Sequence, residues 1–202
     1  MSVLENIEWS QYWAENTSRD KKRVLLVGDS ISVGYRSEVH KRLEGSAYVT
    51  AVSTSKGIDN PNLIREIDFY AHAEEFEYEA IHFNNGLHGF HLDDDGYRKG
   101  YELVIAYFKK QYPSVRLILA LSTPVTLKDA PTMLDPKNDI VLRRNAIVCE
   151  LAEKYHLETN DLYSCVVGRA ELSAGDGFHY KKEGYERLAE QIVSVLNAKE
   201  KR

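Results

Sequence analysis

The sequence predicts an α/β protein: a three-layer α/β/α sandwich around a five-stranded parallel sheet. Short runs rich in Val, Ile and Leu alternate with longer segments of helical periodicity, the pattern of a parallel sheet with crossover helices. The runs lack polar alternation, as expected of strands covered by helices on both faces. The chain has 202 residues, so we expect one domain over 1–202, with 1–20 as an N-terminal helical extension packed on it through Trp9, Tyr12 and Trp13.

Three strands are predicted in the first half of the chain. The first covers 23–27 and leads through a Gly-containing turn into a helix over about 33–43. The second and third cover 48–52 and 80–83. Between them the apolar residues from Leu63 to Ala71 recur at helical spacing, and Pro61 stands where the first turn of a helix accepts proline.

The second half completes the predicted sheet. The acidic run 93–95 marks the start of a long helix, because carboxylates are favoured at a helix N-terminus. The other elements predicted here are a strand over 115–121, a long loop over 125–138, a helix over 139–155, a short strand over 157–162 and a final helix over 181–197.

Composition excludes several classes of protein. The net charge is −5, which argues against a nucleic-acid binder that relies on phosphate neutralisation. No apolar run is long enough to span a membrane, and the first twenty residues lack the apolar region of a secretory signal, so a cytoplasmic protein is expected. Cys149 and Cys165 form no disulfide framework and are predicted to be small buried hydrophobes.

Small or polar turns follow four of the predicted strands, at 28–30, 53–57, 84–89 and 122–124. In open parallel sheets, ligands bind outside the carboxyl ends of the strands. These four turns therefore belong to one rim of the sheet, and that rim is the candidate site.

Two segments of the chain carry residues suited to nucleophilic catalysis. Ser30 follows a strand and precedes a helix, so its side chain is exposed at the strand end, near helix N–H groups that favour developing negative charge. A serine needs a base to remove its proton, and the base needs an orienting carboxylate. Asp176 and His179 lie three residues apart before the last helix and supply both groups.

These segments resemble conserved blocks of the SGNH hydrolases, the GDSL-type esterases and lipases. Residues 24–31 resemble the first block, and 176–179, with Gly184 shortly after, resemble the last. The blocks occur in family order over nearly the whole chain. The resemblance implies a flavodoxin-like fold, no cofactor, Ser30 as nucleophile, His179 as general base and then acid, and Asp176 as the orienting carboxylate.

The family builds its oxyanion hole from the serine N–H, a glycine N–H in the second block and an asparagine side chain in the third. Gly57 matches the second position, although an ordinary turn glycine is the alternative. The third block departs from the family pattern, since His88 stands where the asparagine belongs. We favour Asn84 as the donor, with His88 and Asn85 as alternatives.

The rim also suggests substrate contacts. We assign Asp29, Asn85 and Thr123 to substrate binding, with Pro124 and Val125 beside them. His88 and His91 have His-x-x-His spacing, but no third ligand stands at a defined distance, so no metal site is expected.

The primary hypothesis is a serine esterase that removes short acyl groups, acetyl above all, from a small-molecule ester such as an acetylated sugar. An acyltransferase or a thioesterase would use the same triad. A non-catalytic doubly wound module that binds a ligand at the rim is the rival from another class, but it gives Asp176 and His179 no role.

Overall fold

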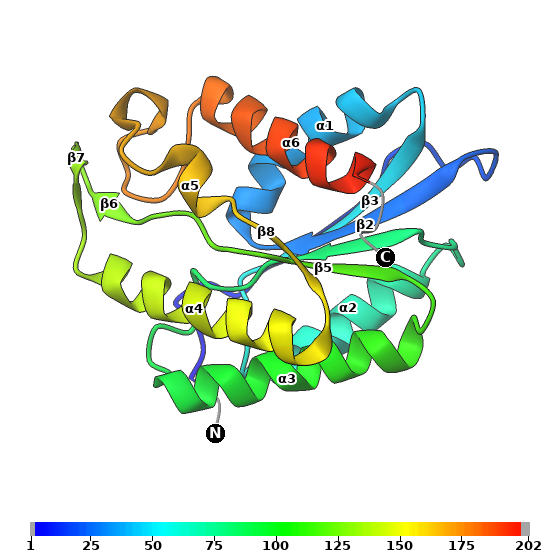
Figure 1. Ribbon diagram of the computed structural model, residues 1–202, viewed down its shortest axis with the longest axis horizontal. Coiled ribbons are helices and arrows are strands. Elements are labelled where there is room, and N and C mark those ends of the chain that lie inside the picture. Colours follow the sequence, from blue (N-terminus) through cyan, green and yellow to red (C-terminus); the bar gives the residue numbers. More distant parts are fainter. Residues whose placement is uncertain (1–2, 199–202) are drawn as a thin grey trace.

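The computed structural model describes residues 3–198, which form three layers with a sheet in the middle (Figure 1). Six strands lie in the order β1-β3-β2-β4-β5-β8. Their bounds are β1 Ser10–Ala14, β2 Lys22–Gly28, β3 Ala47–Thr54, β4 Ala80–Phe83, β5 Arg116–Ala120 and β8 Glu158–Asn160. The last five are mutually parallel. Their order is that of flavodoxin-like folds, as predicted.

Helices cover both faces of the sheet (Figure 1). One face carries α1 (Ser30–Leu43) and α6 (Lys182–Asn197), and the other carries α2 (Asn62–His72), α3 (Asp94–Gln111) and α4 (Lys137–Tyr155). Side chains of β2 alternate between the two layers: Val24 and Leu26 pack toward α1 and α6, Leu25 and Val27 toward the others. Apolar residues therefore fill the strand on both sides.

The prediction of an N-terminal helical extension is wrong. β1 pairs antiparallel with β3, from Ser10 opposite Thr54 to Ala14 opposite Thr50, and gives the sheet a sixth strand. Tyr12 packs into one core layer and Trp13 into the other, which is the two-residue period of a strand. Both side chains pack against the core, as predicted. The segment is a strand because the edge of β3 offers unpaired backbone groups and aromatic residues favour strands.

Other differences lie between β5 and α6. The predicted loop 125–138 contains a hairpin of β6 (Thr126–Leu127) and β7 (Ala130–Leu134), and two short helices, α5 (Tyr163–Val166) and η1 (Ala170–Leu172), follow β8. The prediction for the cysteines is also wrong, since Cys149 lies on the solvent side of α4 and Cys165 is only half-buried. Within residues 3–198, no helix is long and apolar enough to cross a bilayer.

The packing of α1 on α6 gives a stability prediction. A Cβ at Gly34 of α1 would lie 2.1 Å from the ring of Tyr185 in α6. Overpacking of this kind costs about 1–3 kcal/mol, which exceeds the gain of about 1 kcal/mol in helix propensity. Gly34→Ala should therefore lower the free energy of unfolding measured in urea. Gly45→Ala is the control, because no heavy atom lies within 4 Å of its Cβ. Equal stability of the two variants would contradict this packing.

Candidate active site

The turn from β2 into α1 presents Ser30 at the first position of a helix. A Cβ at Gly28 would lie 2.8 Å from the Cβ of Ser32, so the strand can meet the helix this closely only at a glycine. Asp29 caps the helix, because its side chain accepts the N–H of Ile31 at 2.9 Å. Ser32 donates its hydroxyl to the Asp29 carbonyl at 2.6 Å. The turn is fixed by its own residues.

Ser30, His179 and Asp176 form one hydrogen-bonded chain. The Nε2 atom of His179 lies 2.8 Å from Oγ of Ser30, and its Nδ1 atom lies 2.6 Å from Oδ2 of Asp176. A carboxylate accepts only, so Nδ1 carries the proton and Nε2 is free to accept the hydroxyl of Ser30. Three residues separated by up to 149 positions thus reach the geometry of an activated serine.

Asp176 is held as an anion. Partial burial acts to raise the pKa of its carboxyl group, but the N–H groups of His179 and Phe178 and the imidazole of His179 stabilise the carboxylate and lower that pKa to about 2. The two backbone bonds measure 2.8 and 3.0 Å. The carboxylate is therefore charged at neutral pH, as an orienting group for the imidazole requires.

The unpredicted hairpin holds the loop that carries this pair. The N–H of Thr126 donates to the carbonyl of Gly177 at 2.9 Å, and the N–H of Asp129 donates to that of Gly175 at 2.8 Å. A Cβ at Gly177 would lie 2.6 Å from the Thr126 carbonyl oxygen. Because backbone approaches backbone here, a side chain at position 177 would displace the loop that carries His179.

The third-block asparagines are occupied elsewhere. Nδ2 of Asn84 donates to the carbonyl of Ala120 at 2.8 Å and to Oγ of Ser122 at 3.2 Å, which uses both of its protons. Asn85 donates to the carbonyl of Lys56 at 2.8 Å. Asn84 therefore ties β4 to the end of β5, and this geometry does not favour the prediction that it is the oxyanion donor.

His88 and Gly57 lie on two adjoining loops. A Cβ at Gly57 would be 3.0 Å from the Cα atom of Gly89, so the loops after β3 and β4 touch beside His88. Burial raises the pKa of Asp29, and the nearby imidazoles of His88 and His179 act in the opposite direction. The structure thus places His88 close to the buried Asp29, on the same rim as the triad.

Arg144 of α4 fixes the loop that carries His88, and nothing in the sequence indicated it. Its guanidinium donates to the carbonyl oxygens of Gly86 at 2.9 Å, His88 at 2.7 Å and Gly89 at 2.6 Å. The side chain is only 1% exposed and lies over the ring of Tyr97. In a helical pattern a lone arginine is ordinarily solvent-exposed, so only the fold reveals this role.

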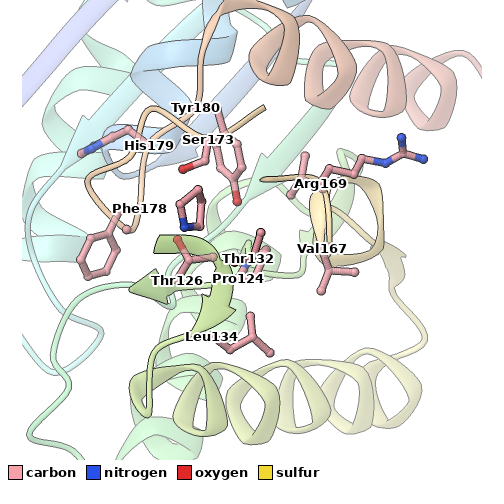
Figure 2. A pocket seen from close by; sticks show the side chains of 14 residues that line it. Pro124, Thr126, Thr132, Leu134, Val167, Arg169, Ser173, Phe178, His179 and Tyr180 are labelled. Carbon is pink, nitrogen blue, oxygen red and sulfur yellow. The ribbon is translucent and has the colours of Figure 1, made fainter. Parts of the chain in front are cut away.

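The residues assigned to substrate binding are mostly buried. Asp29, Asn85 and Thr123 are 1–3% exposed, so little of their surface is open to a substrate. A cavity of about 190 Å³ does lie beside the triad loop, lined by Pro124 as well as by the hairpin and α5 (Figure 2). The imidazole of His179 points away from the middle of this cavity (Figure 2).

His88 and His91 bind different partners. Nε2 of His91 lies 3.0 Å from Oδ2 of Asp59, while His88 faces Glu5. Among residues 3–198, no group of three or more His, Cys, Asp or Glu side chains is placed to hold a metal ion.

The predicted helix start at 93–95 is confirmed, since Asp93 accepts the N–H of Gly96 at 2.8 Å.

The sequence matches no protein-family model and no curated protein. Solved structures do match. An acetyl xylan esterase aligns with a TM-score of 0.71 at 16% identity, covering 86% of this chain and 99% of that one. A mutant acetyl-xylooligosaccharide esterase from Geobacillus gives 0.70 at 15%, covering 90% and 98%. A GDSL-like lipase from Bacteroides thetaiotaomicron gives 0.68 at 14%, covering 87% of each chain.

The chain has the fold of the SGNH hydrolases. This confirms the architecture that residues 24–31 and 176–179 indicated. At such identities the likeness is one of backbone, so the chemistry of this SGNH-type fold has to follow from the chain's own side chains.

The contact between the hairpin and the triad loop can be tested with two glycines. Gly177 and Gly175 both have left-handed φ angles, +95° and +91°, but no heavy atom lies within 4 Å of a Cβ at Gly175. Alanine should cost about 1–3 kcal/mol of backbone strain at either position. Only Gly177→Ala should also displace His179, seen as loss of the hydrogen-bonded imidazole proton signal in NMR spectra. Retention of that signal in Gly177→Ala would contradict the role of the hairpin.

Proposed function

We propose that this protein is a serine esterase that cleaves short acyl esters through an acyl-enzyme. The observation that carries the proposal is the continuous hydrogen-bonded chain from Ser30 through His179 to Asp176. The solved structures of the same fold are described as esterases, lipases and acylhydrolases, which supports ester hydrolysis as the reaction class.

The first half of the proposed reaction forms the acyl-enzyme. Ser30 Oγ attacks the ester carbonyl while its proton passes to Nε2 of His179. The imidazolium that results is stabilised by Asp176, which already accepts the Nδ1 proton at 2.6 Å. His179 then gives its proton to the leaving alcohol, and Ser30 remains acylated.

Water completes the cycle by the reverse sequence. His179 takes a proton from water, the hydroxide attacks the acyl carbonyl, and the proton returns to Ser30 as the carboxylic acid leaves. Because Asp176 stays ionised throughout, it holds the imidazole in one orientation for both halves.

We assign the oxyanion to three donors: the N–H groups of Ser30 and Gly57 and the side chain of His88. The N–H of Ser30 belongs to the first turn of α1, and the N–H groups of a first turn favour negative charge. We assign His88 in place of Asn84, the donor that the sequence favours, because both protons of the Asn84 amide are bound at the end of β5. Backbone contact between the Gly57 and Gly89 loops supports the grouping.

For the substrate we propose an acetyl or similarly short ester of a carbohydrate. Two of the structures with this fold are described as acting on acetylated xylan or xylo-oligosaccharide. The polar side chains of His88, His91 and Asp59, which are 19–30% exposed, suit a hydroxyl-rich leaving group. Transfer of the acyl group to an added sugar alcohol, instead of to water, would identify a transferase that uses the same residues.

The nucleophile is tested by covalent labelling. Ser30 should react with a fluorophosphonate probe, and the intact mass should rise by one probe adduct. Ser30→Ala should lose both the adduct and the hydrolysis of p-nitrophenyl acetate, because no other group supplies the nucleophile. Ser37→Ala is the matched control, since Ser37 is an exposed serine of the same helix. Full activity in Ser30→Ala would refute the mechanism, and a binding module would not react at all.

Alanine substitutions at His88 and Asn84 test the oxyanion assignment through their different effects on activity and on stability. His88→Ala should lower kcat about 100- to 1,000-fold, the effect of one lost oxyanion donor, with little change in stability. Asn84→Ala should do the reverse: it leaves the buried carbonyl of Ala120 without its donor and lowers the free energy of unfolding by about 1–3 kcal/mol. Rates per folded enzyme and urea unfolding of both variants check this. The larger kcat loss in Asn84→Ala would restore the original assignment.

A further inference from the structure

The residues before β1 lie against both loops of the proposed oxyanion hole. We call Val3–Trp9 the N-terminal strap. At its end, Trp9 exchanges hydrogen bonds with Ser55 in the loop after β3: the N–H of Trp9 donates to Oγ of Ser55 at 2.9 Å, and the N–H of Ser55 donates to the Trp9 carbonyl at 3.1 Å. The C-terminal end of the strap is therefore bonded to the same loop that carries Gly57.

Glu8 extends this attachment. Its Oε2 atom accepts the hydroxyl of Ser55 at 3.0 Å and lies 3.3 Å from Nζ of the buried Lys56. Its Oε1 atom accepts the N–H of Glu5 at 3.0 Å. Glu8 thus fixes the backbone at Glu5 relative to the loop after β3, and the Glu5 side chain reaches the loop after β4.

The carboxylate of Glu5 ends beside His88. Oε1 of Glu5 accepts the N–H of Gly89 at 2.8 Å and lies 3.5 Å from Nδ1 of His88. The two side chains are only 35% and 19% exposed, so their attraction is screened less than that of a surface pair. The same pattern holds in the triad, where Asp176 faces Nδ1 of His179.

An imidazole whose Nδ1 faces a carboxylate presents Nε2 to other groups. For Nδ1 of His88 to carry a proton toward the Glu5 carboxylate while Nε2 donates to an oxyanion, both nitrogens must be protonated. Of the charged and titratable groups around the ring, the Glu5 carboxylate from the strap favours that state. Burial raises the pKa of Asp29 at the end of β2, and the Arg144 guanidinium from α4 donates to backbone carbonyls, including that of His88.

We propose that Glu5 is a positioning residue, which orients His88 through Nδ1 and favours its imidazolium form as the oxyanion donor. The proposal rests on the esterase function and on His88 as the donor. It gives the strap a role in the reaction although Glu5 does not touch the reacting atoms.

Glu5→Gln tests the charge without removing the anchor. The amide oxygen of Gln still accepts the N–H of Gly89, so stability should not change, but the negative charge at Nδ1 is gone. We expect kcat for p-nitrophenyl acetate to fall about tenfold with little change in KM. A neighbouring anion favours imidazolium, so without it the alkaline limb of the kcat profile should move to lower pH. Glu15→Gln is the matched control: Glu15 is similarly exposed and pairs with Arg36.

A double-mutant cycle tests whether Glu5 affects kcat through His88. Asn in place of His88 donates to an oxyanion without a proton from Nδ1, so Glu5→Gln should change kcat by less than about twofold in the His88→Asn background. A tenfold loss in both backgrounds would overturn the proposal, because Glu5 would then act through the strap alone. So would a wild-type kcat and pH profile in Glu5→Gln.

The labelling of Ser30 separates this inference from the proposed function. If wild-type Ser30 reacts with the fluorophosphonate and Glu5→Gln hydrolyses p-nitrophenyl acetate like wild type, only the role of Glu5 is refuted. If wild-type Ser30 does not react, the esterase function fails and the role of Glu5 fails with it.

Discussion

The constraint on which the rim depends is that buried backbone groups must find hydrogen-bonding partners outside the sheet ladders. The loop after β4 lies beyond the strand ends, and the carbonyl oxygens of Gly86, His88 and Gly89 face α4. Arg144 satisfies three of them from α4 and is itself almost fully buried. Burial lowers the pKa of its guanidinium, yet carbonyl dipoles and the ring of Tyr97 stabilise the charge. One side chain thus holds the loop that carries His88.

Neighbouring parts of the rim follow the same rule with other donors. Asn145 of α4 exchanges two hydrogen bonds with the backbone of Ser122, and Asn138 accepts the N–H of Val125. These contacts do not involve Oγ of Ser30 or Nε2 of His179, which lie 2.8 Å from each other. Side-chain hydrogen bonds of this kind fix the loops although the loops lie outside the sheet. A preorganised active site requires this, because hydrogen-bond donors that are already in place need not reorient during the reaction.

The sequence predicted the strands well where burial on both faces made them apolar throughout, as in 23–27 and 80–83. It predicted Ser30, Asp176 and His179 because strand-end position and spacing are local properties. It mispredicted Ser10–Ala14, whose two-residue period is short and whose partner strand lies forty residues away. Arg144 and Glu5 carried no local signal, since a charged residue in a helix or near a terminus is ordinarily solvated.

By itself the sequence determined the five parallel strands with the helices between them, the turn that carries Ser30 and the spacing of Asp176 and His179, because each depends on neighbours in the chain. Only the tertiary structure distinguishes the surroundings of the third-block side chains, because the bonds of Asn84 depend on the end of β5 and the surroundings of His88 depend on Glu5, Asp29 and Arg144. Those contacts join residues up to 83 positions apart, and no pattern of spacing encodes them. The physical reason is that buried polar groups of the rim find their hydrogen-bonding partners only when distant segments come together in the folded chain.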